Sequence, residues 1–145
     1  MLDDIKKISE IDKSNLLDDL EKLPYHIEQA VKIVQSNYFE KLFKINNIIF
    51  NGVGGSAISG DIIRSLLWNK LNIPIYVIRN NVLPKWANKN TLVITQSYSG
   101  NTEETINFFK QAFQRKCKMI SISSGGKLRT LCEKREKVLC QAHIL

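Results

Sequence analysis

The chain has 145 residues, 43% of them hydrophobic and 24% charged, and a formal net charge of +7. This length fits one compact globular domain and leaves no room for a second catalytic domain of ordinary size. The basic residues are interleaved with acids instead of being clustered, so the positive net charge is only weak evidence for nucleic-acid binding. No stretch approaches the roughly 20 apolar residues that cross a bilayer.

The N-terminal residues and the cysteines indicate a cytoplasmic protein. Residues 1–15 are charged throughout and lack the apolar core and the cleavage site of a signal peptide. Three cysteines without C-x-x-C spacing are interpreted as packing thiols in a reducing compartment: Cys117, Cys132 and Cys140. We predict no metal ligand set and no cofactor.

Residues 1–45 are predicted to be helical. Ser14 is a candidate cap for a first helix, which Pro24 interrupts. A second helix follows, with apolar residues at 3.6-residue spacing: Ile27, Ala30, Val31, Val34, Tyr38 and Leu42. We expect this segment to pack on a domain formed by residues 46–145.

Short apolar runs alternate with amphipathic stretches in residues 46–145. Five runs are typical of parallel strands buried on both faces: NIIF, IPIYVI, TLVIT, KMISI and KVLC. Helices are predicted around Ile58–Leu66, Ile106–Phe113 and Leu128–Leu131, whereas the connection from Ile78 to Thr91 has no helical stripe and is predicted to be irregular. This order predicts an α/β fold with a five-stranded parallel sheet and right-handed crossovers.

Ligands of open α/β sheets bind beyond the carboxyl ends of the strands. The first such junction, NGVGGSAISGD, has glycines that allow close backbone approach and places Ser56 where a helix would start. A dinucleotide fingerprint would need a third glycine where Ala57 stands and an acid after the second strand, and a P-loop would need Gly-Lys-Ser or Gly-Lys-Thr. NAD and nucleoside triphosphates are therefore disfavoured at this turn.

The second junction, QSYSGNTEET, places Ser97, Ser99 and Thr102 around Gly100, directly before a predicted helix. Hydroxyl donors and free backbone N–H groups at a helix N-terminus suit a phosphate, because its oxygens accept hydrogen bonds and the helix dipole favours negative charge.

Two alternatives stay open at these junctions. Asn101 and Glu104 have the spacing of a capping box, so the second junction could be an ordinary helix start. The third junction, residues 121–127, could complete the rim of the same cleft or be a flexible turn.

Together these motifs resemble a sugar isomerase (SIS) domain. GVGGSAISGD and SYSGNTEET, followed by ISSGGKL, resemble in particular the N-terminal domain of the bifunctional phosphoglucose/phosphomannose isomerases. The resemblance extends from Asn46 to about Leu131. It implies a flavodoxin-like three-layer sandwich, preceded here by the N-terminal helices.

The resemblance also implies a ligand and its binding residues. In that family, the matching turn and hydroxyls hold the phosphate of the sugar, which implies Gly55, Ser56, Ser97, Ser99 and Thr102 as substrate-binding residues. The implied ligand is a hexose 6-phosphate of glucose, mannose or fructose, and the implied reaction is aldose–ketose isomerisation through an enediol. The alternative is a sugar-phosphate sensor or regulator without catalysis.

No catalytic residue is predicted within the chain. Isomerisation needs a base, usually a carboxylate, and the resembled enzymes supply their catalytic Glu, His and Lys from the second half of a longer chain. We expect surface or interface roles for His26 and His143, and a helix-dipole role for Glu103 and Glu104. The isolated chain is therefore expected to be inactive.

The C-terminal residues suggest an incomplete domain. After the fifth predicted strand only QAHIL remains, which is too short for the helix that normally covers a parallel strand. We expect a C-terminally truncated domain that forms a homodimer or is completed by a second chain.

Overall fold

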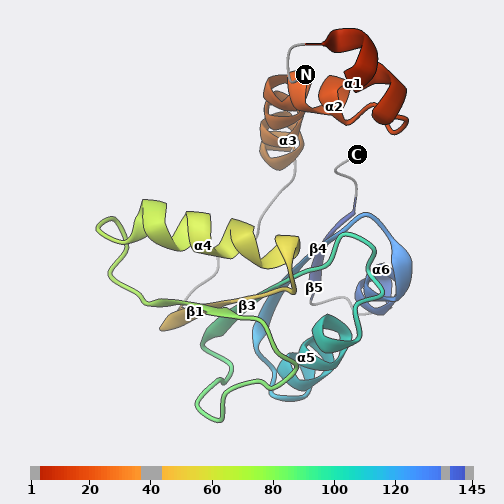
Figure 1. Ribbon diagram of the computed structural model, residues 1–145. Coiled ribbons are helices and arrows are strands. Elements are labelled where there is room, and N and C mark those ends of the chain that lie inside the picture. Colours follow the sequence, from red (N-terminus) through yellow and green to blue (C-terminus); the bar gives the residue numbers. More distant parts are fainter. Residues whose placement is uncertain (1–3, 37–43, 135–137, 143–145) are drawn as a thin grey trace. The chain divides into compact units, whose positions relative to one another are not determined.

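The computed structural model describes residues 4–36, 44–134 and 138–142, and for residue 36 and residues 138–142 it describes the backbone alone. The chain divides into two compact units, Met1–Phe39 and Glu40–Leu145 (Figure 1). None of the helices within the described ranges is long and apolar enough to cross a membrane.

The first unit contains three helices: α1 (Ile5–Ile11), α2 (Leu16–Glu21) and α3 (Leu23–Ser36). The predicted break at Pro24 is displaced, because this proline lies in the first turn of α3, where its missing N–H group has no intrahelical partner to lose. The predicted apolar stripe falls on α3, except that Tyr38 and Leu42 lie outside the described residues.

The predicted cap at Ser14 is wrong. The N-cap residue of α2 is Asn15, whose side chain makes no capping bond. The carboxylate of Asp12 instead accepts hydrogen bonds from the backbone N–H groups of Leu16 and Leu17, each at 2.8 Å. These bonds, that of Leu17 first, hold the pKa of Asp12 below its ordinary value.

We predict that Asp12→Ala weakens the start of α2 in a pH-dependent way. Because the pKa is lowered on folding, the carboxylate stabilises the helix above its unfolded pKa, and this contribution is lost as the pH falls through the folded pKa. NMR hydrogen exchange should show less protection of the Leu16 and Leu17 amides in the variant at neutral pH, with the difference shrinking in acid. The control is Asp19→Ala in the same helix, and an equal loss there would contradict the role of Asp12.

The second unit is built on a parallel sheet with the strand order β2-β1-β3-β4-β5. Each strand overlaps one of the apolar runs in the sequence: β1 (Asn47–Asn51), β2 (Ile75–Ile78), β3 (Thr91–Gln96), β4 (Lys118–Ser123) and β5 (Val138–Ala142). In the register of the central strands, Ile49 pairs with Val93 and Thr95 with Ser121. This strand order is that of flavodoxin-like folds, so the sheet changes direction between β1 and β3.

Three helices cover the two faces of this sheet: α4 (Gly55–Leu67), α5 (Glu103–Gln114) and α6 (Gly126–Glu133). Helix α4 packs on β1 and β2, whereas α5 and α6 pack on β3, β4 and β5 on the other side (Figure 1). Right-handed crossovers that run in opposite directions from the sheet centre produce this arrangement. The predicted parallel α/β fold is confirmed, and the connection from β2 to β3 has no helix or strand, as predicted.

The hydrophobic core lies between the sheet and the α5/α6 layer. Its buried side chains come from the strands, from both helices and from the irregular connection: Ile49, Leu83, Ala87, Val93, Phe108, Phe109, Ala112, Met119, Leu128 and Cys132. Burying each large apolar side chain stabilises the fold by about 1.5–3 kcal/mol. Leu83 and Ala87 therefore anchor the irregular connection to the core, while most of its other residues are exposed.

Two of the cysteines pack as predicted. Cys132 is buried in the core and Cys117 is partly buried against it, where burial raises the pKa of the Cys117 thiol. The side chain of Cys140 lies outside the described residues.

Candidate functional site

The three polar junctions lie at one edge of the sheet. They are the β1–α4 loop (residues 52–54), the β3–α5 loop (residues 97–102) and the β4–α6 loop (residues 124–125). Because the strands are parallel and β1 neighbours β3, the first two loops meet where the sheet changes direction, which is the usual ligand position in this class of fold.

The hydroxyl groups of the β3–α5 loop are organised by bonds within the loop. The Oγ of Ser97 lies 2.9 Å from the Oγ1 of Thr102 and accepts a bond from the Gly100 N–H, and Ser97 is only 2% exposed. The Oγ of Ser99, which is exposed, accepts a bond from the Asn101 N–H. Ser97 is therefore an internal brace, while Ser99 and Thr102 lie closer to solvent.

The capping-box interpretation of Asn101 and Glu104 is wrong. The N-cap residue of α5 is Thr102, and no side chain caps the helix. The Asn101 side chain turns away, accepting a bond from the Lys127 N–H at 3.1 Å and donating one to the Ser99 carbonyl at 3.1 Å. The first N–H groups of α5 are thus left without a side-chain cap, which suits an anion.

The β4–α6 loop is joined to the β3–α5 loop, so it is not a free turn. The N–H and hydroxyl groups of Ser124 both donate to the Tyr98 carbonyl, and the Leu128 N–H donates to the Gly100 carbonyl. Gly100 has a φ of +66°, and a Cβ atom on it would lie 1.8 Å from the Gly125 carbonyl oxygen. Only glycine allows the two loops to approach this closely.

We predict that Gly100→Ala separates the two loops and destabilises the fold. The left-handed backbone and the overlap with Gly125 should together cost about 2–4 kcal/mol of unfolding free energy. Denaturant unfolding followed by circular dichroism measures this loss. Gly55→Ala is the matched control, because its Cβ would meet no atom within 4 Å, and it should change stability by less than about 0.5 kcal/mol. Equal stabilities of the two variants would refute the contact.

The β1–α4 loop approaches the end of β3. A Cβ atom on Gly52 would lie 3.1 Å from the Gln96 carbonyl oxygen, and the Ser59 hydroxyl donates to the Gln96 side chain at 2.6 Å. Helix α4 begins at Gly55 without a side-chain cap, and Ser56 is half-buried in its first turn. The start of α4, with Gly55 and Ser56, is therefore held at the same edge of the sheet as the β3–α5 loop.

Sequence reasoning missed two supporting residues. Asn51, which is buried at the end of β1, donates through its Nδ2 to the carbonyls of Ile78 and Asn80 at 3.0 and 2.9 Å, and so ties the ends of β1 and β2 together. Its Oδ1 has no hydrogen-bond partner among the described residues. The sequence pattern that could have indicated Asn51 is a polar residue at the end of an apolar strand. No local pattern could have indicated Ser59, because its hydrogen-bond partner Gln96 is 37 residues away.

The edge as a whole suits an anion and offers little for acid–base chemistry. Helices α4 and α5 begin there without a side-chain cap, whereas the Asn101 side chain accepts from the Lys127 N–H in the first turn of α6 and Asp4 caps α1. The acids in the first turn of α5, Glu103 and Glu104, are exposed. Within the described parts of the chain, no group of His, Cys, Asp or Glu side chains could hold a metal ion.

Comparisons with known proteins agree with the motifs. The chain is 38% identical over 120 residues to a bifunctional phosphoglucose/phosphomannose isomerase of Caldicellulosiruptor bescii, which covers 82% of this chain and 35% of that protein. It is 37% identical over 111 residues to a protein of the same name from Aquifex aeolicus, covering 70% and 35% of the two chains. No family model matches the chain.

A solved structure shows the same fold. A candidate phosphosugar isomerase from Clostridium difficile superimposes with a TM-score of 0.71 at 26% identity, over 86% of this chain and 36% of that chain. The predicted resemblance to SIS domains and to bifunctional phosphoglucose/phosphomannose isomerases is therefore confirmed. The chain spans about a third of the length of the curated relatives it matches.

Proposed function

We propose, from its homology to bifunctional phosphoglucose/phosphomannose isomerases, that this chain binds a hexose 6-phosphate as the phosphosugar-binding part of a glucose-6-phosphate/mannose-6-phosphate isomerase. The observation that carries the proposal is the uncapped start of α5 beneath the hydroxyls of Ser97, Ser99 and Thr102. Such an arrangement offers hydrogen-bond donors and a favourable dipole to a phosphate. Homology adds the identity of the sugar.

Each hydroxyl would have a distinct part in this binding. The Oγ of Ser99 is the acceptor in its bond with Asn101, so its own proton remains available for a phosphate oxygen. Ser97 and Thr102 share one proton between their oxygens, which leaves one proton of the pair to donate. Because Ser97 is buried, we assign the outward donor to Thr102.

Gly55 and Ser56 would close the site from the side of β1. Their position in the first turn of α4 brings a second uncapped helix start to the same edge. The Gly52 approach to Gln96 and the Ser59 hydrogen bond to the Gln96 side chain hold this helix against the end of β3. Gly55, Ser56, Ser97, Ser99 and Thr102 together form the proposed phosphosugar site.

The first expected outcome is that binding requires the phosphate. Fructose 6-phosphate should raise the melting temperature by several degrees at saturation, since about a hundredfold excess over Kd stabilises a fold by about 2.7 kcal/mol. Free fructose should have no effect, because the proposed contacts are made to the phosphate. Differential scanning fluorimetry measures both, and equal shifts with the two sugars would contradict the assignment.

A matched pair of variants locates this binding on the β3–α5 loop. Ser99→Ala removes an exposed donor to a charged acceptor and should weaken fructose 6-phosphate binding by about tenfold or more. Ser65→Ala, near the far end of α4, removes another exposed serine hydroxyl and should leave the affinity unchanged. Isothermal titration calorimetry compares the two, and an unchanged affinity for Ser99→Ala would exclude that contact.

We further propose that the isolated chain does not turn the substrate over. Proton transfer between neighbouring sugar carbons needs a positioned base, and the proposed residues are glycines and hydroxyl side chains. A coupled assay for glucose 6-phosphate and mannose 6-phosphate isomerisation should therefore read at background, even where fructose 6-phosphate binds. Robust turnover would refute this part of the proposal and leave the binding site intact.

We also keep an alternative function and three further properties of the chain as proposals. The alternative function, a sugar-phosphate sensor, shares the binding site and differs in that no catalytic residues would be found on an associated chain. We propose from the apolar stripe of the second helix that the helical residues 1–45 pack on the domain of residues 46–145. We propose a cytoplasmic location from the charged N-terminal residues, and self-association as a homodimer from the family.

A further inference from the structure

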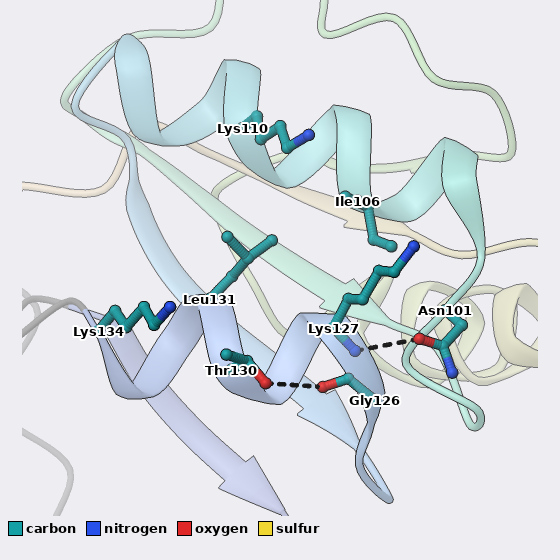
Figure 2. Close-up of a pocket in the computed structure, with 8 residues that line it drawn as sticks. All are labelled: Asn101, Ile106, Lys110, Gly126, Lys127, Thr130, Leu131 and Lys134. Atoms are coloured by element: carbon teal, nitrogen blue, oxygen red, sulfur yellow. Dashed lines mark hydrogen bonds between the residues drawn. The ribbon is translucent and has the colours of Figure 1, made fainter.

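A cavity lies between α5 and α6, outside the proposed phosphosugar residues. Its volume is about 640 Å³, and its lining residues come from both helices and from the loops that precede them: Asn101, Ile106, Lys110, Gly126, Lys127, Thr130, Leu131 and Lys134. Figure 2 shows three lysines distributed around it, Lys110 on α5 and Lys127 and Lys134 at opposite ends of α6. We name this space the lysine cavity.

The charge in the lysine cavity is unbalanced. All three lysines are exposed, and none of the ion pairs formed within the described residues involves them. No acidic residue lines the cavity. The nearby Glu133 is engaged by Arg129 at 2.7 Å. Three like charges around one hollow repel one another and favour an anionic occupant.

The floor of the lysine cavity is apolar. Ile106 is 8% exposed and Leu131 packs against the hydrophobic core, so both present fixed carbon surface. Thr130 adds a hydroxyl group, although its Oγ1 already donates to the Gly126 carbonyl at 3.3 Å (Figure 2). A bare inorganic anion would leave this apolar floor uncovered, whereas an organic anion would bury it.

We propose that the lysine cavity binds a small organic polyphosphate, meaning two or more phosphoryl groups on a carbon frame. Lysine ammonium groups act as flexible point charges toward phosphates, and three of them exceed what one phosphoryl group needs. The volume lies within the range of small-molecule sites. The carbon frame lies on Ile106 and Leu131, and the phosphoryl groups reach Lys110, Lys127 and Lys134.

The lysine cavity is chemically distinct from the phosphosugar site, and this inference does not depend on the proposed function. It shares none of the five proposed phosphosugar residues. It is nevertheless bounded by Asn101 and Lys127, whose hydrogen bond joins the β3–α5 loop to the start of α6. A ligand in the cavity therefore contacts the same two loops on a separate surface.

ATP serves as the probe in the experiment that tests this proposal. Isothermal titration calorimetry of the full chain should detect saturable ATP binding at about 0.15 M salt. This salt concentration screens nonspecific attraction to distant surface charges, so the binding that remains comes from the cavity. Lys110→Gln combined with Lys134→Gln should weaken it by about tenfold or more, because two charge contacts are lost. Lys85→Gln with Lys89→Gln, which removes the same charge from an exposed segment elsewhere, should change the affinity by less than about twofold.

Three further results decide the proposal. Absence of ATP binding, or equal weakening by both double variants, would overturn it. Inorganic triphosphate should bind more weakly than ATP, and equal binding would overturn the role of the carbon frame. Saturating fructose 6-phosphate should not displace ATP, whereas full competition would place ATP in the phosphosugar site. If fructose 6-phosphate itself fails to bind, only the proposed function is refuted, because the lysine variants still test the cavity.

Discussion

The contact of Gly100 with Gly125 is the constraint on which the candidate site depends. The two glycines let the β3–α5 and β4–α6 loops touch backbone to backbone, at a distance that any side chain on Gly100 would prevent. Hydrogen bonds from Ser124 to Tyr98 and from Leu128 to Gly100 lie around this contact. Two loops that would otherwise be separate turns therefore form one rigid edge, and the helices that follow them start from fixed positions.

In the proposed site, this rigidity would let the loop hydroxyls contact a ligand instead of capping the helix. A serine or threonine at an N-cap ordinarily uses its oxygen to accept from the first turn. Here Thr102 directs its oxygen to Ser97, so α5 keeps its donors for another acceptor. The missing cap costs stability of about 1 kcal/mol, which the packing of Phe108 and Phe109 in the core readily offsets. A site prepared in this way loses little entropy when it binds an anion.

The sequence predicted the regular features well, because they are set by local pattern. Apolar runs and the 3.6-residue stripes marked the strands and helices, and the glycine and serine clusters marked the three loops that meet at one edge of the sheet. Features set by distant partners were missed or misassigned. Asn101 has capping-box spacing with Glu104, yet its side chain bonds to Lys127, 26 residues away.

At the start of α2, the carboxylate of Asp12 takes the role predicted for the Ser14 hydroxyl. Its two oxygens accept from two backbone N–H groups at once, which one hydroxyl does less well. The packing of α5 and α6 on one face of the sheet places Lys110 and Lys134 around the same cavity, and no sequence spacing indicates that.

The proposed phosphosugar site and the lysine cavity differ in how they would recognise an anion. The proposed phosphosugar site would use hydroxyls, backbone N–H groups and helix dipoles, which select by geometry and act at short range. The lysine cavity relies on ammonium groups, which act at longer range but are screened by salt and adapt to varied phosphate positions. A ligand of the proposed phosphosugar site would have to match a fixed set of donors. The lysine cavity would instead select a ligand mainly by its total charge and by a carbon frame that covers Ile106 and Leu131. Three of the chain's 21 basic residues, Lys110, Lys127 and Lys134, thus gather around one cavity between two helices, where their charge would favour an anion.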